Sequence, residues 1–178
     1  AFRTTLWAVD LFPVGCPPYV TQLVSPEKLE SLLPGADIVI LSLPLNDQTR
    51  GLFDRRLFGM MKPNSLFVNV ARGPIVVTND LIDMITNGHL AGAVMDVTDP
   101  EPLPPGHPLW STPNVIITPH VGGQSATRAD DVVRIMCENL RRWHDGRPLV
   151  NLITDKRLGF PKRDGSTPLW IDICDQIP

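Results

Sequence analysis

The sequence has few of the features that are typical of metal-binding, nucleic-acid-binding or membrane proteins. It has only three cysteines, Cys16, Cys137 and Cys174, and this odd, scattered set fits a reducing compartment and offers no spacing for a metal site. Basic charge is also scarce: the formal net charge is −3, which leaves no basic stripe for a phosphate backbone. We therefore expect no metal, no nucleic-acid partner and a cytoplasmic location.

Long apolar runs are missing as well. The most apolar window, residues 38–45, is too short to span a membrane and is flanked by Asp37 and Asn46. The first residues do not have the basic and then apolar pattern of a signal peptide. We expect no membrane association. What remains is ordinary for a globular protein, since 178 residues at 43% hydrophobic and 20% charged suffice for one domain with a proper core.

Short apolar runs alternate along the chain with helical patterns. We predict strands at residues 5–10, 37–43, 65–70, 91–97 and 115–118. We predict helices between Ser25 as N-cap and Pro34-Gly35, over residues 54–61, from Thr78 as N-cap to Gly88, and from Ser125 to Trp143. The last of these carries one apolar stripe: Ala129, Val132, Val133, Met136, Leu140 and Trp143.

This alternation predicts an α/β fold with a doubly wound parallel sheet built from right-handed βαβ units. The pattern breaks between Asp99 and Pro119, where seven prolines rule out a crossover helix and predict an ordered loop. The residues between Asp10 and Ser25 are also read as a loop rich in proline.

Arg72, Glu101 and His120 each follow the carboxyl end of a different predicted strand. Ligands of open parallel sheets bind at that edge. A histidine beside a carboxylate can serve as a general acid/base, and an arginine can hold a planar anion with two hydrogen bonds. The three together predict chemistry on a 2-oxo or 2-hydroxy acid. Taken singly, each also has a bland interpretation: a solvent-facing arginine, a solvated carboxylate and a hydrogen-bonded turn histidine.

Three stretches resemble the D-isomer-specific 2-hydroxyacid dehydrogenases, a family that includes phosphoglycerate dehydrogenase and glyoxylate/hydroxypyruvate reductases. The resemblance covers about residues 5–151 and implies a Rossmann-like NAD-binding domain. Its most specific pieces are Asn69-Val70-Ala71-Arg72-Gly73, residues 91–97 leading into Pro100-Glu101-Pro102-Leu103-Pro104, and Thr118-Pro119-His120-Val121-Gly122-Gly123.

By that resemblance, Arg72 would bind the substrate carboxylate, His120 would exchange the proton on the substrate oxygen, and Glu101 would hold His120 protonated. Asp96 would contact the nicotinamide carboxamide. Asp10 would bond the adenosine ribose hydroxyls, as the acidic residue of the dinucleotide fingerprint does. The other positions implied in cofactor binding are Leu43, Pro44, Thr49, Val70, Ala71, Arg72, His120, Gly122 and Gly123.

The cofactor implied is NAD rather than NADP. Leu11, Phe12 and Pro13 follow Asp10, so no arginine stands directly after it to accept a 2′-phosphate, and Arg3 is the one nearby candidate. The loop after Leu43-Pro44 departs from the family in one place, because Asn46 stands where a threonine is common. This departure puts a minor cofactor contact in doubt.

A larger departure concerns the glycine-rich turn that precedes the acidic residue by about 20 positions in the dinucleotide fold. No G-x-G-x-x-G occurs in this chain. We expect residues 1–123 to be a partial NAD-binding domain without its first strand and that turn, and residues 124–178 to be a long helix and a tail returning to a mostly missing substrate domain. In the strand order 3-2-1-4-5-6, the missing strand would lie between the strands at residues 5–9 and 65–70.

The function implied is an NAD-dependent oxidoreductase that transfers a hydride between NAD(H) and a small D-2-hydroxy acid of the 3-phosphoglycerate, glycerate/hydroxypyruvate or glyoxylate class. A homodimer is expected at full length. The alternative is an NAD-sensing corepressor of the same fold. A formate dehydrogenase is disfavoured, because by the resemblance it would want glutamine in place of Glu101. The particular hydroxy acid is left open, since the other wall of the pocket belongs to residues outside the chain.

Overall fold

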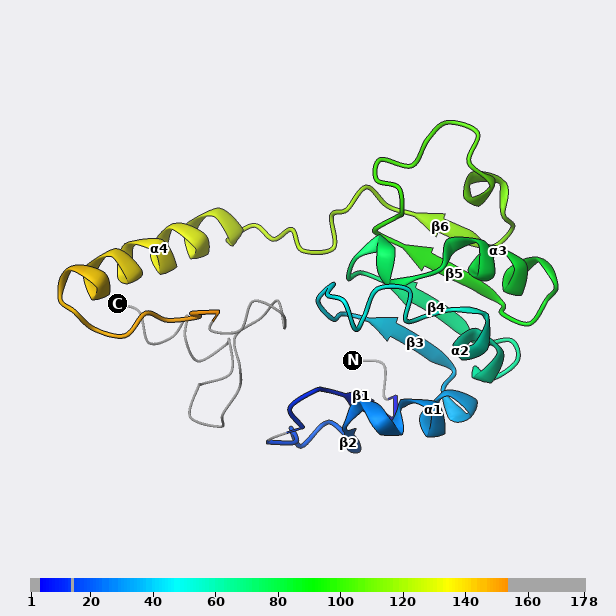
Figure 1. Ribbon diagram of the computed structural model, residues 1–178, viewed down its shortest axis with the longest axis horizontal. Helices are drawn as coiled ribbons and strands as arrows, with labels where there is room; N and C mark the ends of the chain where they lie inside the picture. Colours follow the sequence, from blue (N-terminus) through cyan, green and yellow to red (C-terminus); the bar gives the residue numbers. More distant parts are fainter. Residues whose placement is uncertain (1–3, 14, 154–178) are drawn as a thin grey trace. The chain divides into compact units, whose positions relative to one another are not determined.

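The computed structural model describes residues 4–13 and 15–153. The chain divides into two compact units, Ala1–Gly122 and Gly123–Pro178. The first unit carries strands and short helices, and the second carries one long helix (Figure 1). The strands are β1 Trp7–Val9, β2 Gln22–Val24, β3 Ile38–Leu41, β4 Leu66–Asn69, β5 Gly92–Met95 and β6 Val115–Ile117. The α-helices are α1 Leu29–Leu32, α2 Arg55–Met60, α3 Thr78–Thr86 and α4 Arg128–His144, and the 3-10 turns are η1 Pro26–Lys28, η2 Leu33–Gly35, η3 Gly73–Ile75 and η4 Pro108–Ser111.

The main sheet has four parallel strands in the order β3-β4-β5-β6. The register runs straight across it, with Ile38 opposite Leu66 and Leu66 opposite Gly92. The predicted parallel α/β arrangement is confirmed, and each strand is shorter than expected because its terminal residues enter turns. Residues 99–119 form the predicted loop, which contains η4 and two cis bonds, Asp99-Pro100 and Glu101-Pro102.

Strand β2 was not predicted. It pairs in parallel with β1, with Trp7 opposite Gln22 and Val9 opposite Val24. Three residues are too few to show the alternation of apolar and polar residues that marks a strand. A strand of this length therefore cannot be recognised in a segment that contains several prolines. Asp10 then follows β1, and its backbone N–H donates to the carbonyl of Val24 at 3.0 Å.

The two edge strands of the four-stranded sheet are β3 and β6. Strand β4 has β3 on one side and β5 on the other, so the expectation that the strand at residues 65–70 borders a gap is wrong. The reason is that β3 pairs with β4 along all four of its residues, which moves the edge one strand outward. Among the described residues, β3 has a strand neighbour on one side only.

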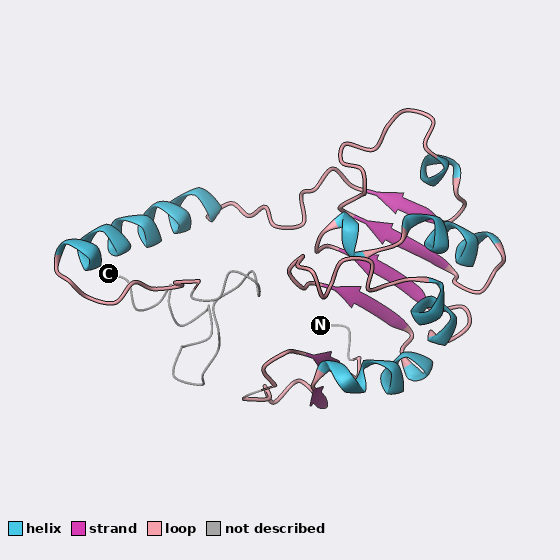
Figure 2. Ribbon diagram, viewed as in Figure 1, coloured by secondary structure: helices cyan, strands magenta, loops and turns pink. Residues whose placement is uncertain are grey.

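The core lies between the sheet and helices α2 and α3, which pack against each other over it (Figure 2). Its centre is a cluster of three aromatic rings, Phe53, Phe58 and Phe67, whose centroids are 5.0–5.7 Å apart. All three side chains are at most 1% exposed, and each contributes on the order of 2 kcal/mol of transfer free energy. Asn69 also faces this side and is completely buried.

The opposite face of the sheet is apolar and exposed in the described structure. Because side chains alternate along a strand, the residues between the core positions all point to this second face. Ile40 is 60% exposed and Ile116 is also 60% exposed. The others on this face with large exposed side chains are Ile38, Leu66 and Val70.

The observed helix ends agree with the predicted caps at some positions and differ from them at others. Asp54 is the N-cap of α2 and accepts from the N–H of Leu57 at 3.0 Å. Thr78 was predicted as an N-cap but is the first residue of α3, because the cap position falls on Val77. The segment after Ser25 is a short α-helix between two 3-10 turns, and Ser25 makes no side-chain cap bond to the backbone. Gly88 has the expected left-handed conformation after α3, with φ +80°.

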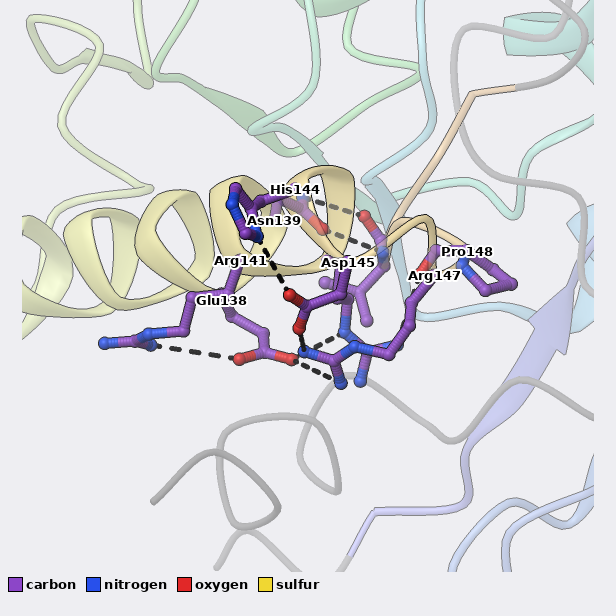
Figure 3. A network of polar contacts seen from close by, with 9 residues as sticks. Glu138, Asn139, Arg141, His144, Asp145, Arg147 and Pro148 are labelled. Carbon is purple, nitrogen blue, oxygen red and sulfur yellow. Dashed lines mark hydrogen bonds and ion pairs between the residues drawn. The ribbon is translucent and has the colours of Figure 1, made fainter.

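Helix α4 begins at Arg128, three residues later than predicted, and Gly146 follows it with φ +66°. All six residues of the predicted apolar stripe lie in α4 and are exposed, with Met136 at 59% and Trp143 at 75%. The carboxyl end of α4 is held by polar contacts (Figure 3). Glu138 accepts from Arg142 at 2.7 Å, and Asn139 exchanges two hydrogen bonds with the backbone of Val150.

No helix in the described part of the chain is long and apolar enough to cross a lipid bilayer. The expected roles of the two units, partial cofactor domain and return to a substrate domain, stay predictions.

Candidate active site

His120 and Glu101 lie against each other where two neighbouring strands end. His120 follows β6 and Glu101 lies in the loop after β5, and the imidazole Nδ1 is 2.6 Å from the carboxylate Oε1. The other carboxylate oxygen accepts from the backbone N–H of Thr98 at 3.4 Å. Both side chains are partly open to solvent, at 44% and 42% exposure. This contact occupies Nδ1, so among the described residues Nε2 of His120 is left free to meet a ligand.

Arg72 stands on the neighbouring loop, after β4, and is exposed. Its guanidinium donates to the carbonyl of Ala71 at 2.5 Å. The loop that carries it is held by the buried amide of Asn69, which accepts from the N–H of Ala71 at 3.0 Å and donates to the carbonyl of Arg72 at 3.1 Å. Asn69 was not among the predicted site residues. Its position as a polar residue inside an otherwise apolar strand was the signal for it.

The loops after β4 and β5 touch at Gly73. A Cβ at this position would lie 1.9 Å from the carbonyl oxygen of Thr98, closer than any two such atoms can approach. The contact brings the backbone beside Arg72 against the backbone that leads to Glu101. Only glycine fits here.

Asp96 is 4% exposed, and its carboxylate is bound on several sides. Oδ1 accepts from the Thr118 hydroxyl at 2.5 Å and from the N–H of Val121 at 2.9 Å, and Oδ2 accepts from the N–H of Gly122 at 2.7 Å. The hydroxyl of Thr118, and then the two backbone donors, lower the pKa of Asp96 against the opposing effect of burial. A carboxylate oxygen has two acceptor directions, so Oδ2 keeps one for a further donor.

The remaining predicted cofactor positions lie in loops after β1, β3 and β4, apart from Gly122 and Gly123, which follow β6. The Asp10 carboxylate accepts from the N–H of Phe12 at 2.8 Å through Oδ1. The Thr49 hydroxyl donates to the carbonyl of Pro44 at 2.8 Å and accepts from the N–H of Asn46, so it holds its own turn. Asn46, the departure from the family, supports the same turn by accepting from the N–H of Gln48.

Val70 is exposed, Leu43 is half-buried and Ala71 is buried. Gly122 packs tightly, since a Cβ there would lie 2.8 Å from Oδ2 of Asp96, whereas Gly123 has open space around it within its own unit. Arg3, the candidate for a 2′-phosphate, lies outside the described residues.

An open depression of about 450 Å³ lies on the same unit. It is lined by residues that include Arg50, Val77, Asn79 and His107. Arg72, Glu101 and His120 are not among its lining residues. The predicted catalytic residues therefore stand on the loops and not in this hollow.

Comparison with known proteins gives the site its context. A family model described as D-isomer specific 2-hydroxyacid dehydrogenase, NAD binding domain, matches residues 1–122. The chain belongs to the D-isomer specific 2-hydroxyacid dehydrogenase family. Its relatives include a glyoxylate/hydroxypyruvate reductase A from Photorhabdus laumondii, 37% identical over 75% of this chain and 42% of that protein. A formate dehydrogenase from Arabidopsis thaliana is 40% identical over 54% of this chain and 25% of that protein.

Solved structures of the dehydrogenase family agree with the Rossmann-like fold. A D-isomer specific 2-hydroxyacid dehydrogenase from Xanthobacter autotrophicus, in complex with NADPH and MES, superposes with a TM-score of 0.77 at 31% identity over 88% of this chain and 72% of that chain. An NADPH-dependent glyoxylate/hydroxypyruvate reductase from Sinorhizobium meliloti, with NADP and sulfate, gives a TM-score of 0.77 at 30% identity over 85% of this chain and 48% of that one. The predicted α/β, Rossmann-like fold class is confirmed.

The chain spans less than half the length of the curated relatives named above. Those relatives have the names of dehydrogenases and reductases, so the corepressor alternative gains no support from them. The two solved relatives contain NADP or NADPH, which leaves the predicted preference for NAD unconfirmed.

Proposed function

We propose that this chain forms the proton-transfer and cofactor side of an enzyme that interconverts a small D-2-hydroxy acid and the corresponding 2-oxo acid. The observation that carries the proposal is the 2.6 Å contact between His120 Nδ1 and Glu101 Oε1 at the carboxyl ends of adjacent parallel strands. A carboxylate in this place stabilises the imidazolium form, and so His120 can donate a proton through Nε2. Arg72, on the next loop, binds the carboxylate of the substrate.

The residues at this edge fit a nicotinamide dinucleotide. Asp10 offers a carboxylate after β1, and Asp96 keeps one acceptor direction on Oδ2 for a carboxamide N–H. When bound, the cofactor supplies the hydride that is exchanged with the substrate carbon. Leu43, Pro44, Val70 and Ala71 contribute the apolar and backbone surface that the cofactor lies on, and Thr49 shapes the turn beside it.

We propose NAD rather than NADP as the preferred cofactor. The support is the carboxylate of Asp10, because a negative charge accepts both ribose hydroxyls and repels a 2′-phosphate. No basic side chain follows directly in residues 11–13. The substrate proposed is glyoxylate, hydroxypyruvate or a phosphorylated relative, and the full-length enzyme is proposed to act as a homodimer.

The test is turnover by the complete protein that contains this chain. NADH oxidation with glyoxylate, hydroxypyruvate or 3-phosphohydroxypyruvate should be measured beside NADPH oxidation. The wild type should reduce at least one of these acids, and His120→Ala should lose on the order of 10²-fold or more in kcat. His144→Ala, which changes an exposed histidine at the end of α4, is the matched control and should keep full activity. A folded protein that binds NADH and reduces none of these acids would contradict the proposal.

A further inference from the structure

The turn that carries His120 is anchored on both sides to one residue, Asp96. The N–H of His120 donates to the backbone carbonyl of Asp96 at 2.9 Å, while the Asp96 carboxylate binds the N–H groups of Val121 and Gly122. Thr118, two residues before the histidine, donates its hydroxyl to the same carboxylate. Asp96 therefore contacts the turn before, at and after the proposed proton donor.

His120 itself has a backbone conformation that needs support. Its φ is +55°, in the left-handed region that residues with a Cβ rarely adopt. Such a conformation persists where surrounding contacts over-determine it. Here those contacts are the hydrogen bonds to Asp96, and the close packing of Gly122 on Oδ2 shows how tightly the turn closes on the carboxylate.

The orientation of the Asp96 carboxylate depends in turn on Thr118. An ionised carboxylate only accepts, so the Thr118 hydroxyl must be the donor in their 2.5 Å contact. This hydroxyl is one of two donors to Oδ1, and Oδ1 is the oxygen that binds Val121. Without the hydroxyl, a buried charged oxygen would lose half of its partners, and the carboxylate could turn away from the 121–122 backbone.

We propose that Thr118 is a positioning residue for proton transfer: through Asp96, its hydroxyl sets the His120 turn and keeps the imidazole against Glu101. This inference rests on the proposed function, because it gives Thr118 a part in a reaction in which His120 moves the proton. Thr118 does not touch the substrate in this scheme. Its effect is on the geometry of the His120–Glu101 pair.

The experiment compares variants that differ in one hydroxyl, in the complete protein. Thr118→Val and Thr118→Ala remove the hydroxyl, and Thr118→Ser keeps it. Both variants without it should lose up to about 10²-fold in reductive kcat, the loss that a misplacement of about 1 Å can cause, and their alkaline pH limb should move to lower pH. Thr118→Ser should restore the limb of the wild type. If Thr118→Val does not fold, the comparison of Thr118→Ala with Thr118→Ser is sufficient for the test.

Thr112→Val is the matched control. Thr112 is buried, whereas Thr118 is half-buried, and the Thr112 hydroxyl donates to the carbonyl of Pro108 at 3.0 Å outside the His120 turn. This variant should lose a hydroxyl–carbonyl hydrogen bond and leave the pH limb in place. A shift as large in Thr112→Val as in Thr118→Val would show a general loss of stability and overturn the inference.

A second readout does not depend on turnover. The NMR chemical shifts of the His120 imidazole, assigned by their loss in His120→Ala, should change in Thr118→Val and Thr118→Ala and return in Thr118→Ser. Unchanged chemical shifts together with an unchanged kinetic limb would overturn the role of Thr118 while the reductase activity stands. Changed chemical shifts in a protein that reduces no 2-oxo acid would overturn the proposed function and leave the positioning role intact.

Discussion

His120 and Glu101 meet because β5 and β6 are neighbours in the sheet and both run toward the same edge. Neither side chain is buried, so solvent screens their interaction and the pair is worth little as a contribution to stability. Its value lies in the charge state of the imidazole. This makes the pair testable through the pH dependence of the reaction.

Glu101→Gln removes the charge of the partner and keeps its shape. Reduction needs protonated His120, and the carboxylate stabilises that form, so the alkaline limb of reductive kcat/KM should move to lower pH in the variant. Oxidation needs neutral His120, and its acidic limb should move to lower pH as well. Measuring both directions from acid to alkaline pH checks the two limbs. An unmoved limb would mean that Glu101 does not tune His120.

Asp10 should set the choice of cofactor. Asp10→Ala removes the acceptor for the ribose hydroxyls and also the charge that repels a 2′-phosphate. The value of kcat/KM with NADH should therefore fall, and the ratio of kcat/KM with NADPH to kcat/KM with NADH should rise. Asp130→Ala removes an exposed carboxylate on α4 and serves as the charge control. Wild-type protein that already prefers NADPH would overturn the assignment.

Asp96 should contribute to stability in a pH-dependent way. Its pKa is lowered in the folded chain, chiefly by the Thr118 hydroxyl, so its contribution is full above the unfolded value of about 3.9 and is lost as pH falls through the lower folded value. Asp96→Asn should therefore cost on the order of 2 kcal/mol at pH 7, and the difference from the wild type should shrink below about pH 4. Urea unfolding of the complete protein at several pH values measures it. A difference that stays constant down to pH 2 would contradict the linkage.

At the scale of elements, the spacing between loops is set by backbone contact. Gly73→Ala would place a methyl group 1.9 Å from the Thr98 carbonyl oxygen, and both partners are backbone, so the loops after β4 and β5 must separate. We expect a loss of about 3 kcal/mol or more in the free energy of unfolding.

Gly59→Ala is the control for that change. Gly59 lies inside α2, and a Cβ there would meet only the end of the Met84 side chain at 3.7 Å, an ordinary contact. Alanine should stabilise the helix by about 0.4–1 kcal/mol. Denaturant unfolding of both variants of the complete protein decides the point, and equal stabilities would show that the loops are not in contact.

At the scale of the whole molecule, apolar surface is the dominant feature of the chain taken alone. One face of the four-stranded sheet and the stripe on α4 are exposed among the described residues, and β3 presents an unpaired edge. Surfaces of this kind pair with other chains. The isolated 178-residue chain should therefore self-associate, bind a hydrophobic dye and show no reductase activity. A monodisperse chain that bound NADH tightly in light-scattering and titration experiments would refute this expectation.

The sequence by itself determined the parallel α/β fold and the family. Alternating runs of apolar residues and helix signals give the order of the elements, and this information is local. The motifs around Arg72, Glu101 and His120 are contiguous in the chain, so they can also be read without a structure. The caps were less predictable, as at Thr78, because neighbouring residues can take the cap position without a change in the pattern.

Tertiary structure alone decided which loops touch. The edge position of β3, the pairing of β2 with β1 and the contact of Gly73 with Thr98 depend on strand neighbours distant in sequence. The hydrogen bond between Asp96 and Thr118 joins residues 22 positions apart, and no pattern in the sequence between them predicts it. Hydrogen bonds of this kind form only when parallel strands bring their carboxyl ends to one edge, and for this reason the support of His120 could not be read from the sequence.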